Sequence, residues 1–208
     1  MSAKRLLPLL TDSSFIVLAL YFIVNYTHSL LTVQSDQGLL FFVYRTLFLV
    51  FQLLSLALFL LRKSAGVFSS KLEDYACTLL ALGLPMLLRP DSGIGVPIVG
   101  IPLEFVGAVV VLGAFLSLNR SFGIAPENRG IKTKGLYRIV RHPMYSGYLL
   151  TEAGFVLSNS SAYNAVIFVS ASLFLVLRLI AEERFLKADP AYEAYARKTP
   201  WKLIPFIL

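Results

Sequence analysis

Long apolar runs constrain this chain more than any other feature of its sequence. Four of them lie at residues 15–33, 39–61, 72–89 and 98–118. An α-helix rises about 1.5 Å per residue, so about twenty apolar residues cross a hydrocarbon core about 30 Å thick. The chain is also 57% hydrophobic, which is unusual for a soluble domain. We therefore predict an all-α integral membrane protein in which these four runs are spanning helices.

Two further apolar stretches, residues 145–158 and 162–181, are separated by the polar sequence SNSSAYN at Ser158–Asn164. Small polar residues of this kind favour a tight turn, so the two stretches predict a helical hairpin. Its first arm would be only about 21 Å long, which is short for a complete crossing. The sequence therefore predicts five or six spans, of which the last form a C-terminal helical hairpin.

The positive charges predict which side of the membrane each loop occupies, because basic loops stay in the cytoplasm. Lysines and arginines gather before the first run, between the second and third runs, and in residues 120–141. We therefore expect a multi-pass membrane protein with both termini, and the site described below, on the cytoplasmic side. Basic loops beside anionic lipid also account for the net charge of +7, so no nucleic-acid partner is expected.

No linker or internal repeat divides the chain. We expect one membrane domain over residues 1–208, with transmembrane helices in residues 1–118. Residues 119–208 would hold a cofactor-binding loop, the hairpin and a cytoplasmic tail. No metal site is expected, because His28 and His142 lie on opposite sides of the predicted membrane and Cys77 lies in an apolar run. The sequence leaves the oligomeric state open.

The sequence GLYRIVRHPMYSG, from Gly135 to Gly147, lies at the mouth of the predicted hairpin. Pro143 suits the first turn of a helix, because its φ angle is fixed and it lacks an N–H group that would be unpaired there. A helix is therefore expected to begin at His142 or Pro143. Its free N–H groups and positive dipole end, together with Arg141, favour the binding of a carboxylate or phosphate.

The second arm of the hairpin brings back the charged sequence RLIAEE at Arg178–Glu183. Arg178 lies as far after the turn, centred near residue 160, as His142 lies before it, so the two are expected at similar membrane depth. Glu182, one helical turn beyond Arg178, shares its face. A ligand that carries both a carboxylate and an ammonium group would suit such a cluster. The side chains expected to converge are Arg141, His142, Arg178, Glu182 and Glu183.

Ordinary explanations exist for these residues taken one at a time. Arg141 also fits a basic cytoplasmic loop, and Arg178 with Glu182 also fits an ion pair on a helix surface. Glu152 differs, because it lies about two turns inside the first arm, where an acidic residue lines a cavity or pairs with another group. The sequence leaves both roles of Glu152 open.

Three segments resemble, in order and spacing, the isoprenylcysteine carboxyl methyltransferase family of membrane enzymes and the related phospholipid N-methyltransferases. They are GLYRIVRHPMYSG, RLIAEE and the tail AYEAYARKTPWKLIPFI at Ala191–Ile207. The resemblance begins near Phe115 and implies S-adenosylmethionine as cofactor, with Arg178 in contact with the substrate. The cofactor contacts that it implies are Tyr137, His142, Pro143, Met144, Tyr145 and Glu182, covered by Glu127, Arg129, Gly130, Ile131 and Lys132.

The resemblance implies direct displacement of a sulfonium methyl group by a heteroatom of a lipophilic or lipidated acceptor that enters from the bilayer. A carboxylate acceptor, as in isoprenylcysteine, is already anionic, so Arg178 would hold it and no base is needed. An amine acceptor, as in phospholipid N-methylation, must lose a proton, and Glu152 or Glu183 would be the base.

The acceptor is left open by the run HPMYSGY, which departs from the HPSYxGW common in enzymes that act on prenylated cysteine. The differing positions are Met144 and Tyr148. Two other classes also remain: an NADPH-dependent membrane reductase of the sterol type, and a transporter or binding protein without catalytic activity.

Overall fold

The computed structural model describes residues 3–32, 39–63, 67–69, 71–89, 95–121, 123–124 and 127–207. Within these ranges the chain is almost entirely helical, which confirms the predicted all-α fold. The α-helices are α1 (Ala3–Leu31), α2 (Leu39–Leu60), α3 (Leu72–Gly83), α4 (Pro97–Leu118), α5 (Pro143–Ser158), α6 (Ala162–Leu186) and α7 (Pro190–Lys198). Short 3-10 helices lie at η1 (Leu84–Leu87), η2 (Asn119–Ser121) and η3 (Gly135–Arg138).

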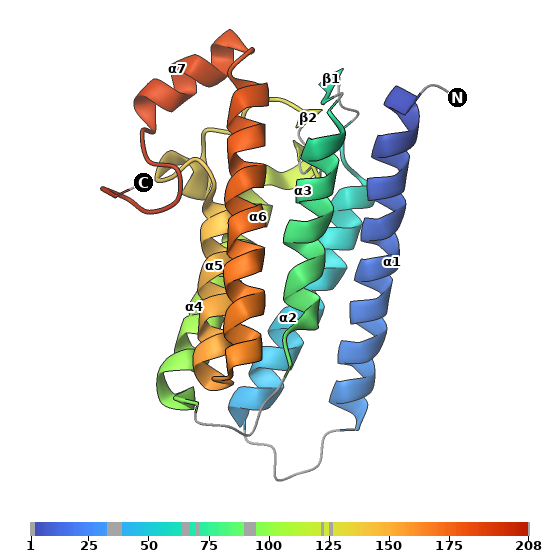
Figure 1. Cartoon of the computed structure of the whole chain (residues 1–208), viewed down its shortest axis with the longest axis vertical. Coiled ribbons are helices and arrows are strands. Elements are labelled where there is room, and N and C mark those ends of the chain that lie inside the picture. Colours follow the sequence, from blue (N-terminus) through green and yellow to red (C-terminus); the bar gives the residue numbers. More distant parts are fainter. Residues whose placement is uncertain are drawn as a thin grey trace.

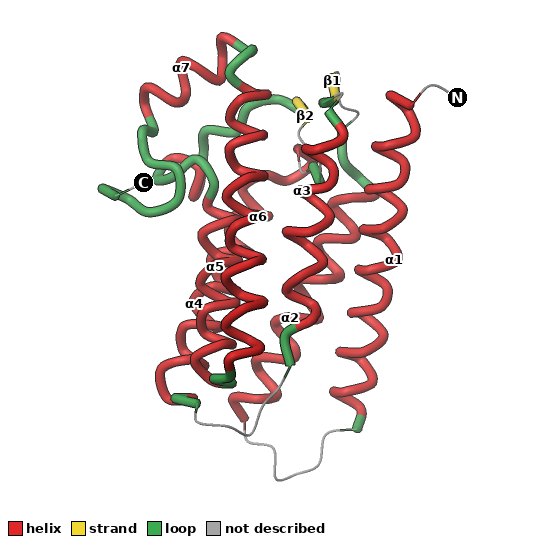
Figure 2. Tube along the Cα trace, viewed as in Figure 1, coloured by secondary structure: helices red, strands yellow, loops and turns green. Residues whose placement is uncertain are grey.

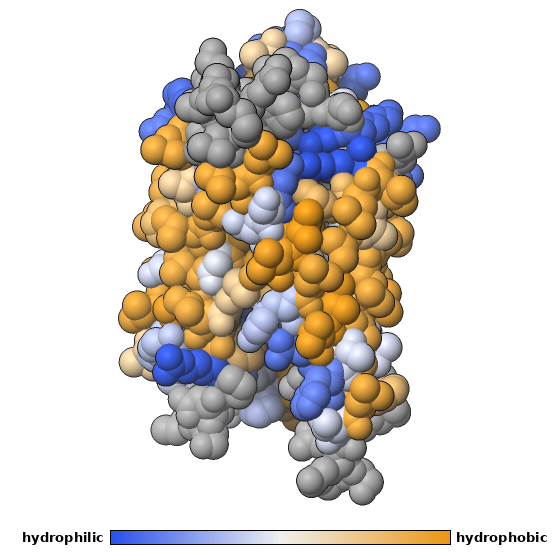
Figure 3. All heavy atoms as spheres, turned by 90° about the vertical axis from the view of Figure 1, so that its right-hand side faces the viewer, coloured by the Kyte–Doolittle hydropathy of each residue, from blue (hydrophilic) through white to orange (hydrophobic). Residues whose placement is uncertain are grey.

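Three helical stretches among the described residues are long and apolar enough to cross a membrane. They are Leu9–His28, Pro97–Leu118 and Ala162–Leu186. In the space-filling view of the α1 side, an apolar band fills the middle of the molecule and hydrophilic residues gather toward both ends (Figure 3). This pattern is typical of a protein with a hydrocarbon belt between two aqueous faces. The count of five or six spans stays a prediction.

Helices α1 to α6 run side by side, and α7 lies across one end of them (Figure 1). The start of α1, the strands β1 and β2, and α7 all lie at this end, whereas the α5–α6 turn and the start of α4 lie at the other. The tube view shows how few strand residues interrupt the helices (Figure 2). The basic segments that predict a cytoplasmic location therefore share one end of the molecule. That this end faces the cytoplasm stays a prediction.

Helices α4 and α5 pack with their backbones in contact because glycines face one another. A Cβ atom on Gly147 would lie 2.9 Å from the carbonyl oxygen of Gly107, and one on Gly154 would lie 2.5 Å from the amide nitrogen of Glu104. Small residues at helix interfaces allow this approach inside membranes, where dispersion contacts replace the hydrophobic effect. The α4–α5 pair forms the rigid support on which the start of α5 is placed.

The hairpin turn lies at the end of the molecule far from α7, and its bounds agree with the polar sequence that predicted it. Helix α5 ends at Ser158, and Ser161 caps α6 by accepting a hydrogen bond from the Asn164 amide at 3.2 Å. The buried Asn164 side chain also accepts from the Arg89 amide at 3.1 Å and donates to the Arg89 carbonyl at 2.9 Å. Asn164 therefore fastens the hairpin to the segment that follows η1.

A two-stranded pairing at the α7 end was not predicted. Strand β1 (Val67–Phe68) pairs antiparallel with β2 (Glu127–Asn128), so the link between α2 and α3 meets the link between α4 and α5. A strand of two residues is too short to show the alternation of apolar and polar residues by which strands are predicted from sequence. The pairing anchors the segment that the sequence predicted to cover the cofactor.

Candidate cofactor and acceptor site

An open cleft with about 790 Å³ of empty space, part of it continuous with solvent, lies where α5 and α6 meet η3, β2 and α7. It is lined by Leu118, Ser121, Gly123, Glu127, Asn128, Arg129, Gly130, Ile131, Lys132, Tyr137, Arg141, His142, Met144, Tyr145, Arg178, Glu182, Leu186, Tyr192 and Tyr195. Three of the residues named from the sequence, Pro143, Glu152 and Glu183, are not part of this lining.

Helix α5 begins at Pro143 with His142 at its N-cap, as the sequence predicts. The amides of Arg141 and His142 are already used, because they donate to the carbonyls of Trp201 and Lys202 at 2.9 and 2.8 Å. The Met144 amide, at the second position of the helix, has no acceptor among the described residues. Met144 also lines the cleft, and the first N–H groups of a helix have no partner within the helix.

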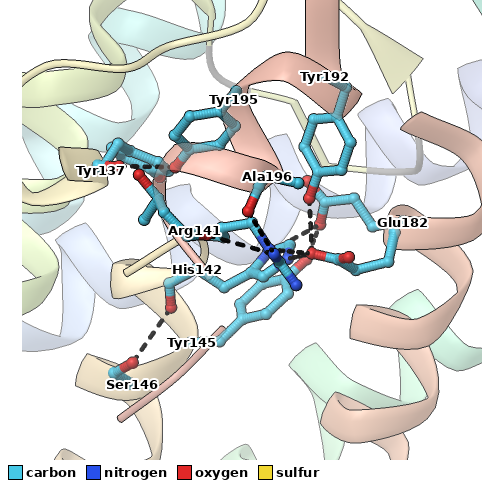
Figure 4. A network of polar contacts seen from close by, with 11 residues as sticks. Tyr137, Arg141, His142, Tyr145, Ser146, Glu182, Tyr192, Tyr195 and Ala196 are labelled. Carbon is cyan, nitrogen blue, oxygen red and sulfur yellow. Dashed lines mark hydrogen bonds and ion pairs between the residues drawn. The ribbon is translucent and has the colours of Figure 1, made fainter. Parts of the chain in front are cut away.

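Glu183 is the buried centre of a polar network that joins three helices. Figure 4 shows how Arg141, His142 and Tyr192 of this network lie. The Oε1 atom of Glu183 accepts from Arg141 Nε at 2.8 Å and from the Tyr192 hydroxyl at 2.6 Å, and it lies 2.8 Å from His142 Nε2. Arg141 also donates to the carbonyls of Ala196 and Thr199 at the end of α7. The network therefore fixes the start of α5 and the end of α7 against α6.

The neighbouring Glu182 faces the cleft instead. Its side chain is 31% exposed, and its Oε2 atom accepts from the Tyr145 hydroxyl at 2.5 Å. The Nδ1 atom of His142 lies 4.0 Å from the same oxygen, and the His142 and Tyr145 rings stack at 5.3 Å. Glu182 thus presents a supported but accessible carboxylate, which suits a ligand ammonium group.

Arg178 reaches the cleft from the membrane side of Glu182. It is 6% exposed, its Nη2 atom donates to the Ile124 carbonyl at 2.6 Å, and its guanidinium lies 5.1 Å from the centre of the Tyr145 ring. Its Nη1 atom is buried and has no hydrogen-bond partner among the described residues. A buried, unpaired guanidinium nitrogen is costly, so this geometry favours a bound anion or other acceptor beside Arg178.

The segment 127–132 covers the cleft on the side away from α5. Arg129 donates to both carboxylate oxygens of Glu127 at 2.8 Å, and both side chains are almost fully buried. Burial raises the pKa of Glu127, and the hydrogen bond and charge of Arg129 oppose this shift. Asn128 ties the segment to α7 through a 2.7 Å hydrogen bond to Asp189. Gly130 follows with a φ of 91°, a conformation that favours glycine.

Helix α7 supplies cleft residues that the sequence analysis missed. Tyr192 and Tyr195 both line the cleft, and the Tyr195 hydroxyl donates to the Tyr137 carbonyl at 2.7 Å. Burial raises the pKa of both tyrosines well above the ordinary range, so both hydroxyls stay protonated as donors. The sequence AYEAYARK places the two tyrosines three residues apart on one helical face, a signal that could have identified them.

Glu152 lies deeper along α5 than the cleft. It follows Tyr145 and Tyr148 at helical spacing, and no hydrogen bond of its side chain occurs among the described residues. Pro143 is fully buried and does not line the cleft, and it starts α5. Metal-binding clusters of histidine, cysteine and acidic residues are absent from the described part of the chain.

The half of the chain that builds this cleft is similar to membrane methyltransferases. Residues 94–192 match the sequence model of a family described as phospholipid methyltransferase. This match confirms the resemblance seen in the hairpin motifs, and it covers the helices that carry Arg141, His142, Arg178 and Glu182.

Individual relatives are plant protein-S-isoprenylcysteine O-methyltransferases. The chain is 29% identical to form B of Arabidopsis thaliana over 116 residues, which is 52% of this chain and 58% of the relative. It is 32% identical to form A over 93 residues, or 42% of this chain and 47% of the relative. A probable enzyme of the same kind from Oryza sativa subsp. indica is 32% identical over 117 residues, which is 52% of this chain and 61% of the relative. The matches thus span about half of each relative.

Proposed function

We propose that this protein transfers a methyl group from S-adenosylmethionine to a lipophilic acceptor in the membrane, most readily the carboxylate of an isoprenylcysteine-like molecule. The observation that carries the proposal is one cleft with two different charged walls. An accessible carboxylate, Glu182, faces it on one side. The buried Arg178 lines the same cleft, and its Nη1 atom has no hydrogen-bond partner among the described residues. The named activity of the plant relatives supports this choice.

The cofactor end of the cleft would be the wall nearest α7. Glu182 would accept hydrogen bonds from the methionyl ammonium group, and the Met144 amide with Arg141 would receive the carboxylate. Tyr137 and residues 127–132 would cover the remainder. When bound, S-adenosylmethionine supplies an electrophilic methyl group whose bonding electrons return to its sulfur when an acceptor atom attacks.

The acceptor end would be the wall at Arg178. Because Nη2 is held by the Ile124 carbonyl, Nη1 is fixed in place and can donate to a carboxylate without further ordering. Arg178 would therefore orient an acceptor carboxylate, and no group of the protein needs to remove a proton. Tyr145 and residues 127–132 would limit access of water to the reacting atoms.

Phospholipid-type N-methylation is the second candidate, because Glu152 lies in the bilayer half of α5 without a hydrogen-bond partner among the described residues. An amine acceptor must lose a proton, and Glu152 would receive it. Glu183, the other base considered from the sequence, already accepts from Arg141 and Tyr192 and lies 2.8 Å from His142 Nε2, so its carboxylate is occupied. Glu152 is therefore the better base for an amine.

The proposal is tested with purified protein in lipid nanodiscs. The protein is incubated with S-adenosylmethionine carrying a tritiated methyl group and with either N-acetyl-S-farnesylcysteine or phosphatidylethanolamine. Base-labile label in the prenylcysteine confirms carboxyl methylation, and base-stable label in the phospholipid supports the amine alternative. Absence of both products, with NADPH binding in place of S-adenosylmethionine binding, would show that the cleft belongs to a reductase.

A further inference from the structure

The chain ends in an ordered tail, residues 199–207, that exposes large apolar side chains. Ile204, Phe206 and Ile207 are 50%, 84% and 75% exposed. Phe206 has a φ of 68°, a bend that brings its ring to 5.5 Å from the ring of Trp201. Adjacent apolar side chains at a chain end are not explained by the cleft, because none of them lines it.

Hydrogen bonds hold this tail at the level where α5 enters the helical bundle. The carbonyl oxygens of Trp201 and Lys202 accept from the amides of Arg141 and His142, and the Leu203 carbonyl accepts from Ser146 Oγ at 2.6 Å. The tail lies beside the upper part of the bundle, below α7 (Figure 1). In a membrane-spanning chain, this level corresponds to the boundary between headgroups and aqueous phase.

Exposed cations precede the tail in the chain and also lie on η3, which contacts α7. Arg197 and Lys198 are exposed in the last turn of α7, immediately before the tail, and Lys134 and Arg138 are exposed around η3, on which α7 rests. The exposed acid on α7 is Glu193, one turn before Arg197. Aromatic and aliphatic side chains combined with lysine and arginine are typical of segments that lie in the interface of an anionic membrane.

We propose that residues 199–207 are an interfacial anchor, which inserts Phe206 and Ile207 among the headgroups of an anionic leaflet. Burial of these side chains in the leaflet would remove their apolar surface from water, and Arg197 and Lys198 would approach lipid phosphates. Because the tail accepts hydrogen bonds from the Arg141 and His142 amides, its seating in lipid also holds the start of α5 in place.

Trp201 provides a direct measurement, because the chain contains one tryptophan. The full chain is placed in nanodiscs whose lipids carry bromine near the headgroup or near the end of the acyl chain. We expect shallow bromine to quench Trp201 fluorescence more than deep bromine, and more strongly in phosphatidylglycerol mixtures than in phosphatidylcholine alone. Equal access to aqueous iodide and no difference between bromine depths would overturn the anchor.

Paired variants show whether the quenching of Trp201 depends on insertion of the tail or only on the lipid that surrounds the protein. F206S/I207S should lose about half or more of the shallow quenching, since it removes most of the exposed apolar surface of the tail. Ile98→Ser is the matched control, because Ile98 is 83% exposed at the start of α4, at the opposite end of the bundle. Unchanged quenching in F206S/I207S would contradict the proposal. Quenching changes that appear only in nanodiscs with two protein copies would also contradict it, because they would mean that a second copy covers the tail.

The charges are tested in the same assay. R197Q/K198Q should abolish most of the difference between anionic and zwitterionic lipid, whereas Lys63→Gln, at an exposed lysine after α2, should preserve it. An anionic-lipid effect that survives R197Q/K198Q would show that these cations do not contact the leaflet.

The effect of the tail on cofactor binding in the cleft rests on the proposed function, and it is measured separately. F206S/I207S should weaken S-adenosylmethionine binding severalfold in anionic nanodiscs, and Ile98→Ser should not. If the unaltered protein binds no S-adenosylmethionine, the proposed function fails while the quenching result still decides the anchor. If it binds S-adenosylmethionine equally well with and without Phe206 and Ile207, the tail anchors without supporting the site.

Discussion

At the scale of single residues, Glu182 and Glu183 show how neighbours on one helix take different tasks. Successive helical residues point about 100° apart, so one carboxylate faces the cleft and the other faces α5 and α7. Glu182 is 31% exposed in its side chain, whereas Glu183 is 7% exposed and binds three donors. We infer that Glu182 contacts the cofactor and that Glu183 is a positioning residue.

Glu182→Gln should weaken S-adenosylmethionine binding by about 10- to 100-fold, the loss expected for one charge-assisted hydrogen bond to a ligand cation. Calorimetry or equilibrium dialysis in detergent measures this change. The control is Glu193→Gln, an exposed acid on α7 outside the cleft lining. Equal affinities of the Glu182→Gln protein and the unaltered protein would place the ammonium group elsewhere.

Arg178→Ala should lower turnover by about 100-fold while S-adenosylmethionine affinity stays within about twofold, because Arg178 is assigned to the acceptor. Single-turnover methyl transfer and ligand binding are measured on the same preparation. Arg184→Ala is the control, since Arg184 lies on the same helix but is half exposed and pairs with acids of α3. A parallel loss of cofactor affinity in Arg178→Ala would assign this residue to the cofactor instead.

The sequence predicted that Arg178, His142 and Glu182 meet. Hairpin depth placed Arg178 near His142, helical spacing placed Glu182 on the face of Arg178, and all three line the cleft. It did not predict that Glu183 binds Tyr192, because this contact depends on where α7 lies. That contact joins segments whose relative position no local pattern encodes.

At the scale of secondary-structure elements, α7 covers one side of the cleft and is hydrogen-bonded to it. It is short and polar, and it contacts the site through hydroxyl groups and main-chain carbonyls. Apolar periodicity revealed the long helices because lipid and core select apolar residues over many turns. A nine-residue polar helix has no such signal, so the sequence indicated only a tail.

Tyr192→Phe should lower the unfolding midpoint in detergent, because it removes a buried hydrogen bond to a carboxylate worth about 1.5–3 kcal/mol. Differential scanning fluorimetry follows the midpoint, and proteolysis at α7 reports local release. The matched control is Tyr163→Phe, whose hydroxyl has no hydrogen bond among the described residues. An unchanged midpoint and unchanged proteolysis would show that α7 is held by other contacts.

Gly154→Ala should destabilise the fold by about 1–3 kcal/mol through overpacking of the α4–α5 interface. The added Cβ would lie 2.5 Å from the Glu104 amide nitrogen and 2.6 Å from the Gly100 carbonyl oxygen, both backbone atoms. Gly83→Ala is the control, because nothing lies within 4 Å of a Cβ at that helical position. Equal stability of the two variants would mean that α4 and α5 can separate freely.

At the scale of the whole molecule, the two ends differ in charge and in task. The cleft, the paired strands and α7 gather at the end where the basic segments lie, and the far end holds the hairpin turn and the Asn164 contacts. The sequence predicted this arrangement through the positions of its basic segments. It did not reveal how the N-terminal helices pack beside the hairpin, because generic apolar helices pack in many ways.

Reporter fusions test the membrane orientation. Tags at the N-terminus and after Leu208 should both be accessible from the cytoplasm, and a tag in the residue 159–161 turn should be accessible from the opposite side. Selective permeabilisation followed by protease digestion distinguishes the three positions. Protection of either terminal tag would reverse or break the predicted topology.

The glycine contacts between α4 and α5 have a consequence for traffic in the plane of the bilayer. Backbones that touch along Gly100, Gly107, Gly147 and Gly154 leave no width for a hydrocarbon chain to pass between these two helices. On the proposed function, a lipid-borne acceptor that moves laterally toward Arg178 would therefore approach from the flank of α5 that faces away from α4. The absence of side chains at these four glycines would thus restrict the direction of substrate entry.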